Sequence, residues 1–289
     1  MKINKMFSEK KPLIAFEIFP PKPDVPVETI YEKLSRFEAL KPDYISVTYG
    51  AGGSQKGRTI DIASRIRQNH GIESMAHFTC VGHSREEIDH MVGTMHDQGL
   101  ENILALRGDP PVGDADFDFS KNMYCYAYEL VEHVRSVNNF CIAAAAYVEG
   151  HVDSKRLKED IIRLKQKVDS GVDFLLTQLF FDNRLFYDFM DKVRSIGIRC
   201  PVAAGIMPIF RADQIKSITA RSGCSIPARL VLMMDKYNDN PDDLRKAGVE
   251  YAAGQIRDLV ENGVEGIHLY TMNRPESTKE ILQAAGING

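Results

Sequence analysis

Eight short apolar segments recur along the 289-residue chain, and charged stretches with helical spacing separate them. Strands that are apolar on both faces and alternate with amphipathic helices are typical of a parallel (β/α)8 barrel. We therefore expect an α/β fold, a single TIM-barrel domain over residues 1–289, with a closing helix at about 275–286. The expected strands are 13–19, 44–49, 74–80, 102–108, 141–147, 174–180, 201–207 and 266–272.

Nearly every one of these segments ends in a polar residue. The side chains of a (β/α)8 barrel that carry chemistry stand at the C-terminal ends of its strands. We therefore expect these residues to share one mouth. They are Glu17, Thr48, His77, Arg107 with Asp109, Tyr147, Gln178, Gly205 and Arg274.

Local signals mark where the helices begin and end. A glycine after a helix adopts the left-handed conformation that ends it, and we expect such stops at Gly71, Gly99, Gly171, Gly197 and Gly263. Ser84 and Glu87 form a capping box. The long gap before the eighth strand holds helical patterns at about 212–222 and 242–262, with 226–237 between them. The irregular segment 109–120 is longer than an idle βα loop, so we expect a function for it.

Composition excludes several classes of protein. The net charge is −4 with both signs interspersed, which gives no electrostatic case for nucleic acid or a membrane surface. No apolar run approaches the ~20 residues that span a bilayer, and the basic segment 1–11 lacks a signal-peptide core. The five scattered cysteines favour reduced thiols, and hence a cytoplasmic protein.

The sequence lacks the residues that several chemistries known in (β/α)8 barrels require. No lysine lies within an expected strand, which disfavours a Schiff-base aldolase. The histidines form no metal-binding pair, so no metal is expected, and His83, His90 and His96 are interpreted as surface residues. The glycine-rich segment 49–54 matches neither the Gly-x-x-x-x-Gly-Lys-Ser/Thr loop for a nucleoside triphosphate nor the Gly-x-Gly-x-x-Gly dinucleotide turn. On spacing alone we expect a flexible βα loop, with phosphate binding as the alternative.

The remaining polar residues favour a particular kind of ligand. A buried acid, a basic–acidic pair, an amide, a histidine and several hydroxyls suit a heteroaromatic ligand and one protonation event. They include no redox group, so an oxidation or reduction would require an organic cofactor.

At these residues the chain resembles the methylenetetrahydrofolate reductase family, in its short, prokaryotic-type form with the catalytic barrel only. The motifs occur in family order from residue 12 to about 285. They are FEIFPP at 16–21, SVTYGA at 46–51, AHFTC at 76–80, LRGD at 106–109, AY at 146–147, TQLFFD at 177–182, GIMP at 205–208 and YTMNR at 270–274.

The resemblance implies a flavoprotein that binds FAD. It would take hydride from NADH or NADPH and reduce 5,10-methylenetetrahydrofolate to 5-methyltetrahydrofolate. Glu17 would be the general acid, with a pKa raised by its apolar neighbours Phe16, Ile18 and Phe19. Asp109 would contact the folate and tune the flavin potential, and Gln178 would use both donor and acceptor to read the pterin edge.

Further contacts come from the same resemblance. Gln214 and Arg274 are carried over as folate contacts. The expected FAD contacts are Thr48, His77, Arg107, Gly108, Asp109, Tyr124, Tyr147, His151, Asp160 and Lys167. Ile218 stands where some relatives have a stacking aromatic residue, a role that Phe210 could assume. Gln166 replaces a basic residue of the family, and Arg163, one turn earlier, is expected to share the diphosphate contact.

Other interpretations of these residues stay open. Glu17 could belong to an internal ion pair, Asp109 to a solvated turn, Gln178 to the core, Lys167 to a helix surface and Arg274 to a helix cap. A cofactor-free lyase or aldolase explains the fold but not the missing strand lysine. A flavin-bearing subunit that receives electrons from a partner protein is the main alternative function. Nicotinamide preference and homo-oligomer formation are not legible in the sequence.

Overall fold

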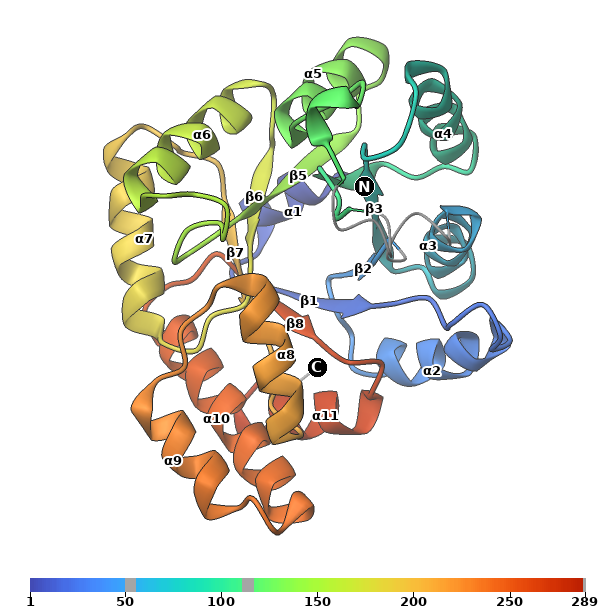
Figure 1. The fold of residues 1–289 in the computed structure, drawn as a ribbon. Helices are drawn as coiled ribbons and strands as arrows, with labels where there is room; N and C mark the ends of the chain where they lie inside the picture. The colour runs from blue at the N-terminus through green and yellow to red at the C-terminus, as the bar shows by residue number, and fades with distance from the viewer. Residues whose placement is uncertain (50–55, 111–116, 288–289) are drawn as a thin grey trace.

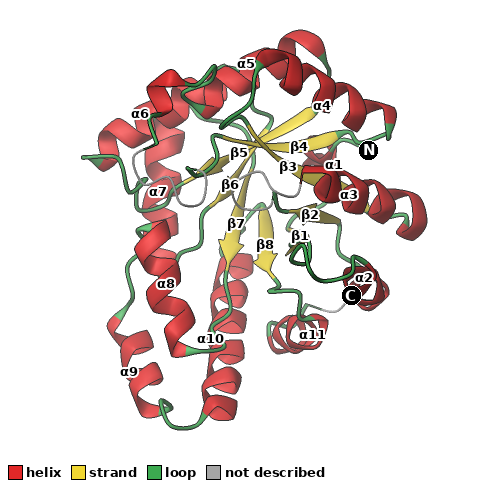
Figure 2. Cartoon of the chain, turned by 45° about the vertical axis from the view of Figure 1, so that its right-hand side comes forward, coloured by secondary structure: helices red, strands yellow, loops and turns green. Residues whose placement is uncertain are grey.

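The computed structural model describes residues 1–49, 56–110 and 117–287. Within them, eight parallel strands form a closed barrel in which each strand pairs with its neighbours in sequence and β8 pairs with β1 (Figures 1 and 2). The predicted (β/α)8 barrel is confirmed, although every strand ends one to three residues before the predicted limit. The strands are β1 (Leu13–Ile18), β2 (Tyr44–Val47), β3 (Glu73–Thr79), β4 (Asn102–Leu106), β5 (Cys141–Ala146), β6 (Phe174–Thr177), β7 (Val202–Ile206) and β8 (Gly266–Tyr270).

Helices surround the barrel, and Figures 1 and 2 show α8, α9 and α10 grouped on one side of it. They are α1 (Ile3–Glu9), α2 (Glu28–Glu38), α3 (Lys56–His70), α4 (Arg85–Asp97), α5 (Ala127–Val137), α6 (Leu157–Asp169), α7 (Asn183–Ser195), α8 (Ala212–Ser222), α9 (Ala228–Lys236), α10 (Pro241–Glu261) and α11 (Pro275–Ala284), with a short 3-10 turn η2 (Phe119–Lys121).

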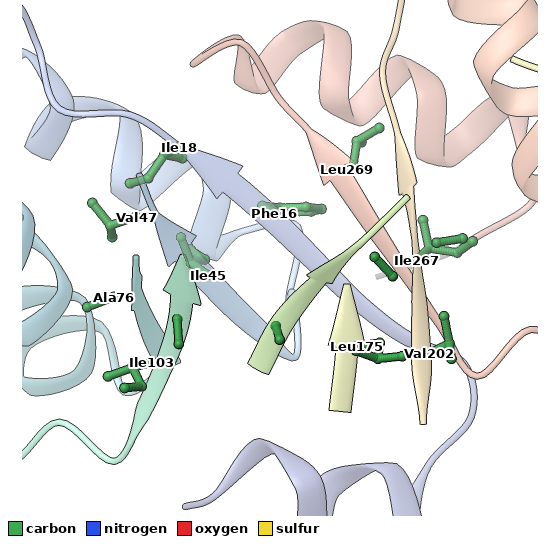
Figure 3. Packing of buried hydrophobic residues seen from close by; sticks show 14 of the residues in the cluster. Phe16, Ile18, Ile45, Val47, Ala76, Ile103, Leu175, Val202, Ile267 and Leu269 are labelled. Atoms are coloured by element: carbon green, nitrogen blue, oxygen red, sulfur yellow. The ribbon is translucent and has the colours of Figure 1, made fainter. Parts of the chain in front are cut away.

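Alternation along each strand separates two apolar layers. Outward residues such as Phe16 and Ile18 on β1 and Leu269 on β8 belong to the large core between strands and helices (Figure 3). Inward residues such as Ala15 and Tyr44 form a second cluster inside the barrel. Because side chains of a strand point alternately to opposite faces, Glu17 shares the inward face with Ala15.

Helix α1 covers the inner cluster at the N-terminal end of the strands, close to β5 and β6 (Figure 1). Ile3 and Phe7 are buried there, and the Phe7 ring lies 5.3 Å from that of Phe174. This helix was not predicted, because three apolar residues in seven gave too weak a pattern. It closes the barrel floor and leaves the C-terminal end as the open one.

The predicted helix boundaries hold at most positions. Ser84 makes both bonds of the capping box, and all five predicted stop glycines have positive φ angles. Segment 226–237, for which no helix was predicted, contains α9. Its exposed Val231 and Leu232 break the amphipathic pattern that usually identifies a helix.

The structure also bears on the state of the cysteines and on membrane-spanning helices. All five cysteines are free thiols. Among the residues that the structure describes, no helix is both long enough and apolar enough to cross a lipid bilayer.

Phe7→Ala tests whether α1 is part of the barrel core. Removing a ring that is 2% exposed should lower the free energy of unfolding by about 3–5 kcal/mol, because a cavity replaces the ring. Urea denaturation followed by circular dichroism measures it. The control Leu232→Ala removes an apolar side chain that is 69% exposed and should cost less than about 0.5 kcal/mol. A Phe7→Ala loss no larger than this control would contradict the role of α1.

Candidate active site

A cavity of about 320 Å³ opens at the C-terminal ends of the strands. It brings together nine residues predicted from the sequence, which come from the first six strands and the loops that follow them. These are Glu17, Thr48, His77, Arg107, Gly108, Asp109, Tyr147, His151 and Gln178.

The Glu17 carboxylate stands on the inward face of β1 between two histidines. Its Oε2 lies 3.2 Å from His268 Nε2 and 3.6 Å from His77 Nε2. The expected apolar surroundings are wrong in one respect, since Phe16 and Ile18 point to the outer face of the strand. Imidazole rings rather than apolar side chains therefore define the environment of this acid.

His268 was missed by sequence reasoning. It lies within β8, is fully buried, and contacts Ser46 Oγ at 3.3 Å as well as Glu17. A usable signal was present, because His268 and Tyr270 are two residues apart on β8 and so share its inward face. Nδ1 of His268 has no hydrogen-bond partner among the described residues.

His77 is buried on the inward face of β3. Burial lowers its pKa to about 4, although the Glu17 carboxylate acts in the opposite direction. Its Nε2 makes no hydrogen bond within the described residues, because 3.6 Å to Glu17 is too long. A neutral imidazole nitrogen is thus available at the mouth.

The segment after β4 depends on Gly108. This residue has a φ of +94°, and a Cβ there would come within 2.5 Å of Val81 Cγ1. Glycine therefore permits a tight turn that sets Arg107 and Asp109 on either side. The Arg107 guanidinium stacks over the Phe119 ring at 4.0 Å and pairs with Asp153 at 3.3 Å.

Gln178 and Tyr270 form a second polar group of the mouth. The Tyr270 hydroxyl donates towards Gln178 Oε1 and the carbonyl of Thr177, both at 3.3 Å. A Cβ at position 205 would lie 2.4 Å from the Thr177 carbonyl oxygen and 3.0 Å from the Tyr270 ring, so Gly205 makes room for both. Burial raises the pKa of Tyr270, which keeps the hydroxyl a donor.

A second cavity of about 160 Å³ adjoins the first, and Arg107, Tyr147 and His151 line both. It contains the predicted residues Asp160, Arg163 and Lys167 of α6. The surface interpretation of Lys167 is wrong. Its ammonium donates to the carbonyl of Ala145 at 2.6 Å, and burial lowers its pKa to about 8.

Three predicted site residues do not line either cavity. The Tyr124 hydroxyl instead bonds His133 Nδ1, whose Nε2 lies 2.8 Å from Asp89. Gln214 on α8 has a buried Nε2 without a partner among the described residues. Arg274 stands at the N-terminus of α11 with its guanidinium 4.8 Å from the centre of the Phe210 ring.

Several other residues singled out in the sequence lie outside the mouth. Ile218 and Phe210 belong to apolar clusters and line neither cavity, and the stacking role of Phe210 stays a prediction. His83 is buried, against the surface prediction, whereas His90 and His96 are exposed. Residues 50–54 of the glycine-rich segment and residues 111–116 of the loop 109–120 lie outside the described residues. Over the described ranges, no group of three or more metal-binding side chains occurs.

Comparison with known proteins gives a consistent result. A family model described as methylenetetrahydrofolate reductase matches residues 2–286. Methylenetetrahydrofolate reductase (NADH) 1 of Arabidopsis thaliana is 35% identical over 297 residues, which cover 99% of this chain and 50% of that protein. The 5,10-methylenetetrahydrofolate reductase of Escherichia coli K12 is 32% identical over 274 residues, covering 95% of this chain and 90% of that protein. The chain thus spans about half the length of the plant relative.

Solved structures share the fold at low sequence identity. An uncharacterized protein from Clostridium thermocellum has a TM-score of 0.67 at 14% identity, with 99% of both chains covered. A 2,3-dimethylmalate lyase has a TM-score of 0.53 at 11% identity, covering 99% of this chain and 88% of that one. At these identities the similarity shows the barrel fold alone.

His77 should make the protein less stable in acid. Its pKa of about 4 in the folded chain is below the ordinary value of 6.5, so the unfolded chain binds the proton more readily. The neutral His77 imidazole makes its full contribution to the free energy of unfolding above pH 6.5. That contribution is lost as pH falls towards 4, by about 3 kcal/mol in total. Urea denaturation between pH 7.5 and pH 4 should show a shallower decline for His77→Asn. Exposed His90→Asn is the control, and identical declines in all three proteins would refute the effect.

Proposed function

Because the chain belongs to the methylenetetrahydrofolate reductase family, we propose that it reduces 5,10-methylenetetrahydrofolate to 5-methyltetrahydrofolate with FAD as cofactor and NADH or NADPH as electron donor. One observation carries the proposal: the mouth holds the Glu17 acid on β1 together with the Gln178 amide after β6. An acid and an amide in one cavity suit protonation and orientation of a pterin.

The two adjoining cavities fit FAD by the chemistry of their residues. Arg107, Arg163 and Lys167 line the smaller cavity, and three cations suit a diphosphate. The Lys167 ammonium supports this most directly, since its burial is costly and Asp160 only partly offsets that cost, so a bound anion would stabilise it further. Thr48 and His77 would contact the ring system in the mouth. FAD, when bound, supplies the hydride acceptor and donor that the side chains lack.

Glu17 supplies the proton in this proposal. The methylene bridge of the substrate must open to an iminium before it can accept hydride, and protonation of the bridging nitrogen by Glu17 opens it. The carboxylate that remains is then held by His268, whose Nε2–H can donate to Oε2 across 3.2 Å. His268 thus positions the acid.

Asp109 supplies a negative charge on the far side of the Gly108 turn from Arg107. Its carboxylate lines the mouth after β4, where it can accept hydrogen bonds from the amino group or ring N–H groups of a pterin. The same charge would oppose accumulation of negative charge on a neighbouring reduced ring system.

Known proteins add support for the ligands. The Clostridium thermocellum protein with this fold binds two copies of 5-methyl-5,6,7,8-tetrahydrofolic acid. The Arabidopsis thaliana and Zea mays relatives are named as NADH enzymes, which favours NADH over NADPH as the donor to test first. Reduction of the flavin by a nicotinamide alone, without added protein, would also exclude the partner-dependent subunit.

Glu17→Gln should separate the two half-reactions. Anaerobic stopped-flow absorbance should show flavin reduction by NADH within about twofold of the wild type. Reoxidation by methylenetetrahydrofolate should slow by roughly 10²- to 10⁴-fold, because an amide cannot donate the acidic proton. The control Glu9→Gln, on the barrel floor, should change neither rate. Equal loss of both half-reactions would refute the general-acid role.

The cations of α6 should contribute unequally to FAD binding. Lys167→Met should weaken FAD affinity by roughly 100-fold, since the buried ammonium meets the diphosphate away from water. Exposed Arg163→Ala should weaken it by roughly fivefold, because solvent screens its charge. Fluorescence titration of the apoprotein with FAD measures both.

Lys165→Ala is the matched control, because this lysine lies on the same helix and pairs with Asp169 outside the cavity. It should bind FAD as the wild type does. Unchanged affinity in Arg163→Ala would count against its diphosphate contact, and an equal loss in all three variants would mean that α6 acts through stability alone.

A further inference from the structure

The segment that follows β8 has a strained backbone. Met272 and Asn273 have φ angles of +52° and +53°, in the left-handed region that residues with a Cβ rarely adopt. Among the described non-glycine residues, only Lys41 shares a positive φ with them. Two adjacent residues stay in this region only where surrounding contacts hold them there. Here those contacts lead to the end of β1.

Thr271 ties the end of β8 to the backbone of the candidate acid. Its N–H donates to the carbonyl oxygen of Glu17 at 3.3 Å, and its hydroxyl donates to the same oxygen at 2.6 Å. The hydroxyl oxygen also accepts the backbone N–H of Asn273 at 3.2 Å. Because Thr271 is 1% exposed, water does not replace these bonds. The left-handed turn is thereby joined to Glu17 through one buried hydroxyl.

Asn273 continues the pairing of the two strands one step beyond Glu17. Its Oδ1 accepts the backbone N–H of Phe19 at 3.1 Å, and its Nδ2 donates to the carbonyl of Phe19 at 2.8 Å. A side-chain amide has the same donor and acceptor as a peptide group, so it can stand in for one. Pro20 and Pro21 follow, and neither has an N–H with which β1 could continue. The amide therefore fixes the last residue of β1 that can pair.

We infer that Thr271 and Asn273 are positioning residues that hold Glu17 where it protonates the ligand, an inference that rests on the proposed function. Together they form a clamp on the backbone of β1, at Glu17 itself and two residues further on. The Glu17 side chain then meets His268 at 3.2 Å. A displacement of about 1 Å at a reacting group can slow a reaction roughly 100-fold, so a loose strand end would be costly.

The clamp reaches the chemistry only through β1. Of the described residues that line the two cavities, neither Thr271 nor Asn273 is one, so neither touches a ligand there. In the proposed reaction, reduction of the flavin by a nicotinamide does not use the Glu17 proton, whereas reduction of the folate does. Loss of the clamp should therefore affect the two half-reactions unequally.

Asn273→Gly tests the amide of the clamp. Glycine adopts a positive φ freely, so this variant removes the amide without adding backbone strain. Reoxidation of the reduced flavin by methylenetetrahydrofolate should slow roughly 10- to 100-fold, because the acid is displaced. Flavin reduction by NADH should stay within about twofold of the wild type, because no proton from Glu17 is needed. Anaerobic stopped-flow absorbance measures both rates.

Thr271→Val tests the hydroxyl at nearly constant shape. It should slow reoxidation by about tenfold, since the Glu17 carbonyl keeps only the longer of its two bonds to Thr271. Thr271→Ser retains the hydroxyl and should stay within about threefold of the wild type. Thr278→Val is the matched control. Thr278 is equally buried, but its hydroxyl bonds the carbonyl of Arg274 at 3.0 Å rather than β1, so the wild-type rate should remain.

The double variant Glu17→Gln/Asn273→Gly decides whether the clamp acts through the acid. Effects that pass through one group are not additive, so this variant should match the reoxidation rate of Glu17→Gln within about twofold. A further loss of about tenfold would show that the turn acts elsewhere and would overturn the inference. Equal losses in both half-reactions of Asn273→Gly would overturn it as well.

Hydrogen exchange tests the clamp without any substrate. The Phe19 amide should exchange roughly tenfold faster in Asn273→Gly than in the wild type or Thr278→Val, because its acceptor is lost. Mass spectrometry of peptides from residues 13–22 measures this. Unchanged exchange would overturn the inference whatever the activity. Failure of methylenetetrahydrofolate to reoxidise the wild-type flavin would instead overturn the proposed function, and exchange would still decide whether the clamp exists.

Discussion

Closure of the barrel is the constraint on which the site depends. Because β8 pairs with β1 in register, Ala15 lies beside His268 and Glu17 beside Tyr270. Each strand then places every second side chain inside, and the inward positions at the C-terminal ends meet around one opening. A shift of one residue in β1 would turn Glu17 outward and Phe16 inward. The chemistry of the mouth is therefore fixed by the same apolar layer that joins strands to helices.

The interior becomes more polar from the floor to the mouth. At the floor, Phe7 and Phe174 are in contact and exclude water. Above them Ser46, His268 and Glu17 form a short polar chain with contacts of 3.3 and 3.2 Å. Both contacts use Nε2 of His268, and its buried Nδ1 has no partner among the described residues. The acid is thus supported from below, while its exposed side faces the cavity.

Sequence patterns predicted the structural features that recur along the chain and missed features that occur only once. Eight apolar segments with glycine stops specified the barrel, and polar strand ends such as Glu17 and Gln178 specified the mouth. Helix α1 was missed because its packing surface is created by the closed barrel and is invisible locally. His268 was missed because it lies inside an apolar strand rather than at its end. Tyr124 was carried over from a family resemblance, which cannot reveal that His133 already occupies its hydroxyl.

The two cavities differ in charge, and this difference suits a ligand with an anionic part and an uncharged ring. In the smaller one, burial holds the pKa of Lys167 to about 8, although Asp160 acts to raise it. An anion arriving there meets a cation whose desolvation was completed during folding, so the attraction is little reduced by a new dehydration cost. In the larger one, burial keeps His77 neutral beside Glu17. Arg163 and Lys167 thus add positive charge at the side cavity, Arg107 lines both cavities, and the mouth holds the Glu17 acid, the neutral His77 imidazole and the Gln178 amide.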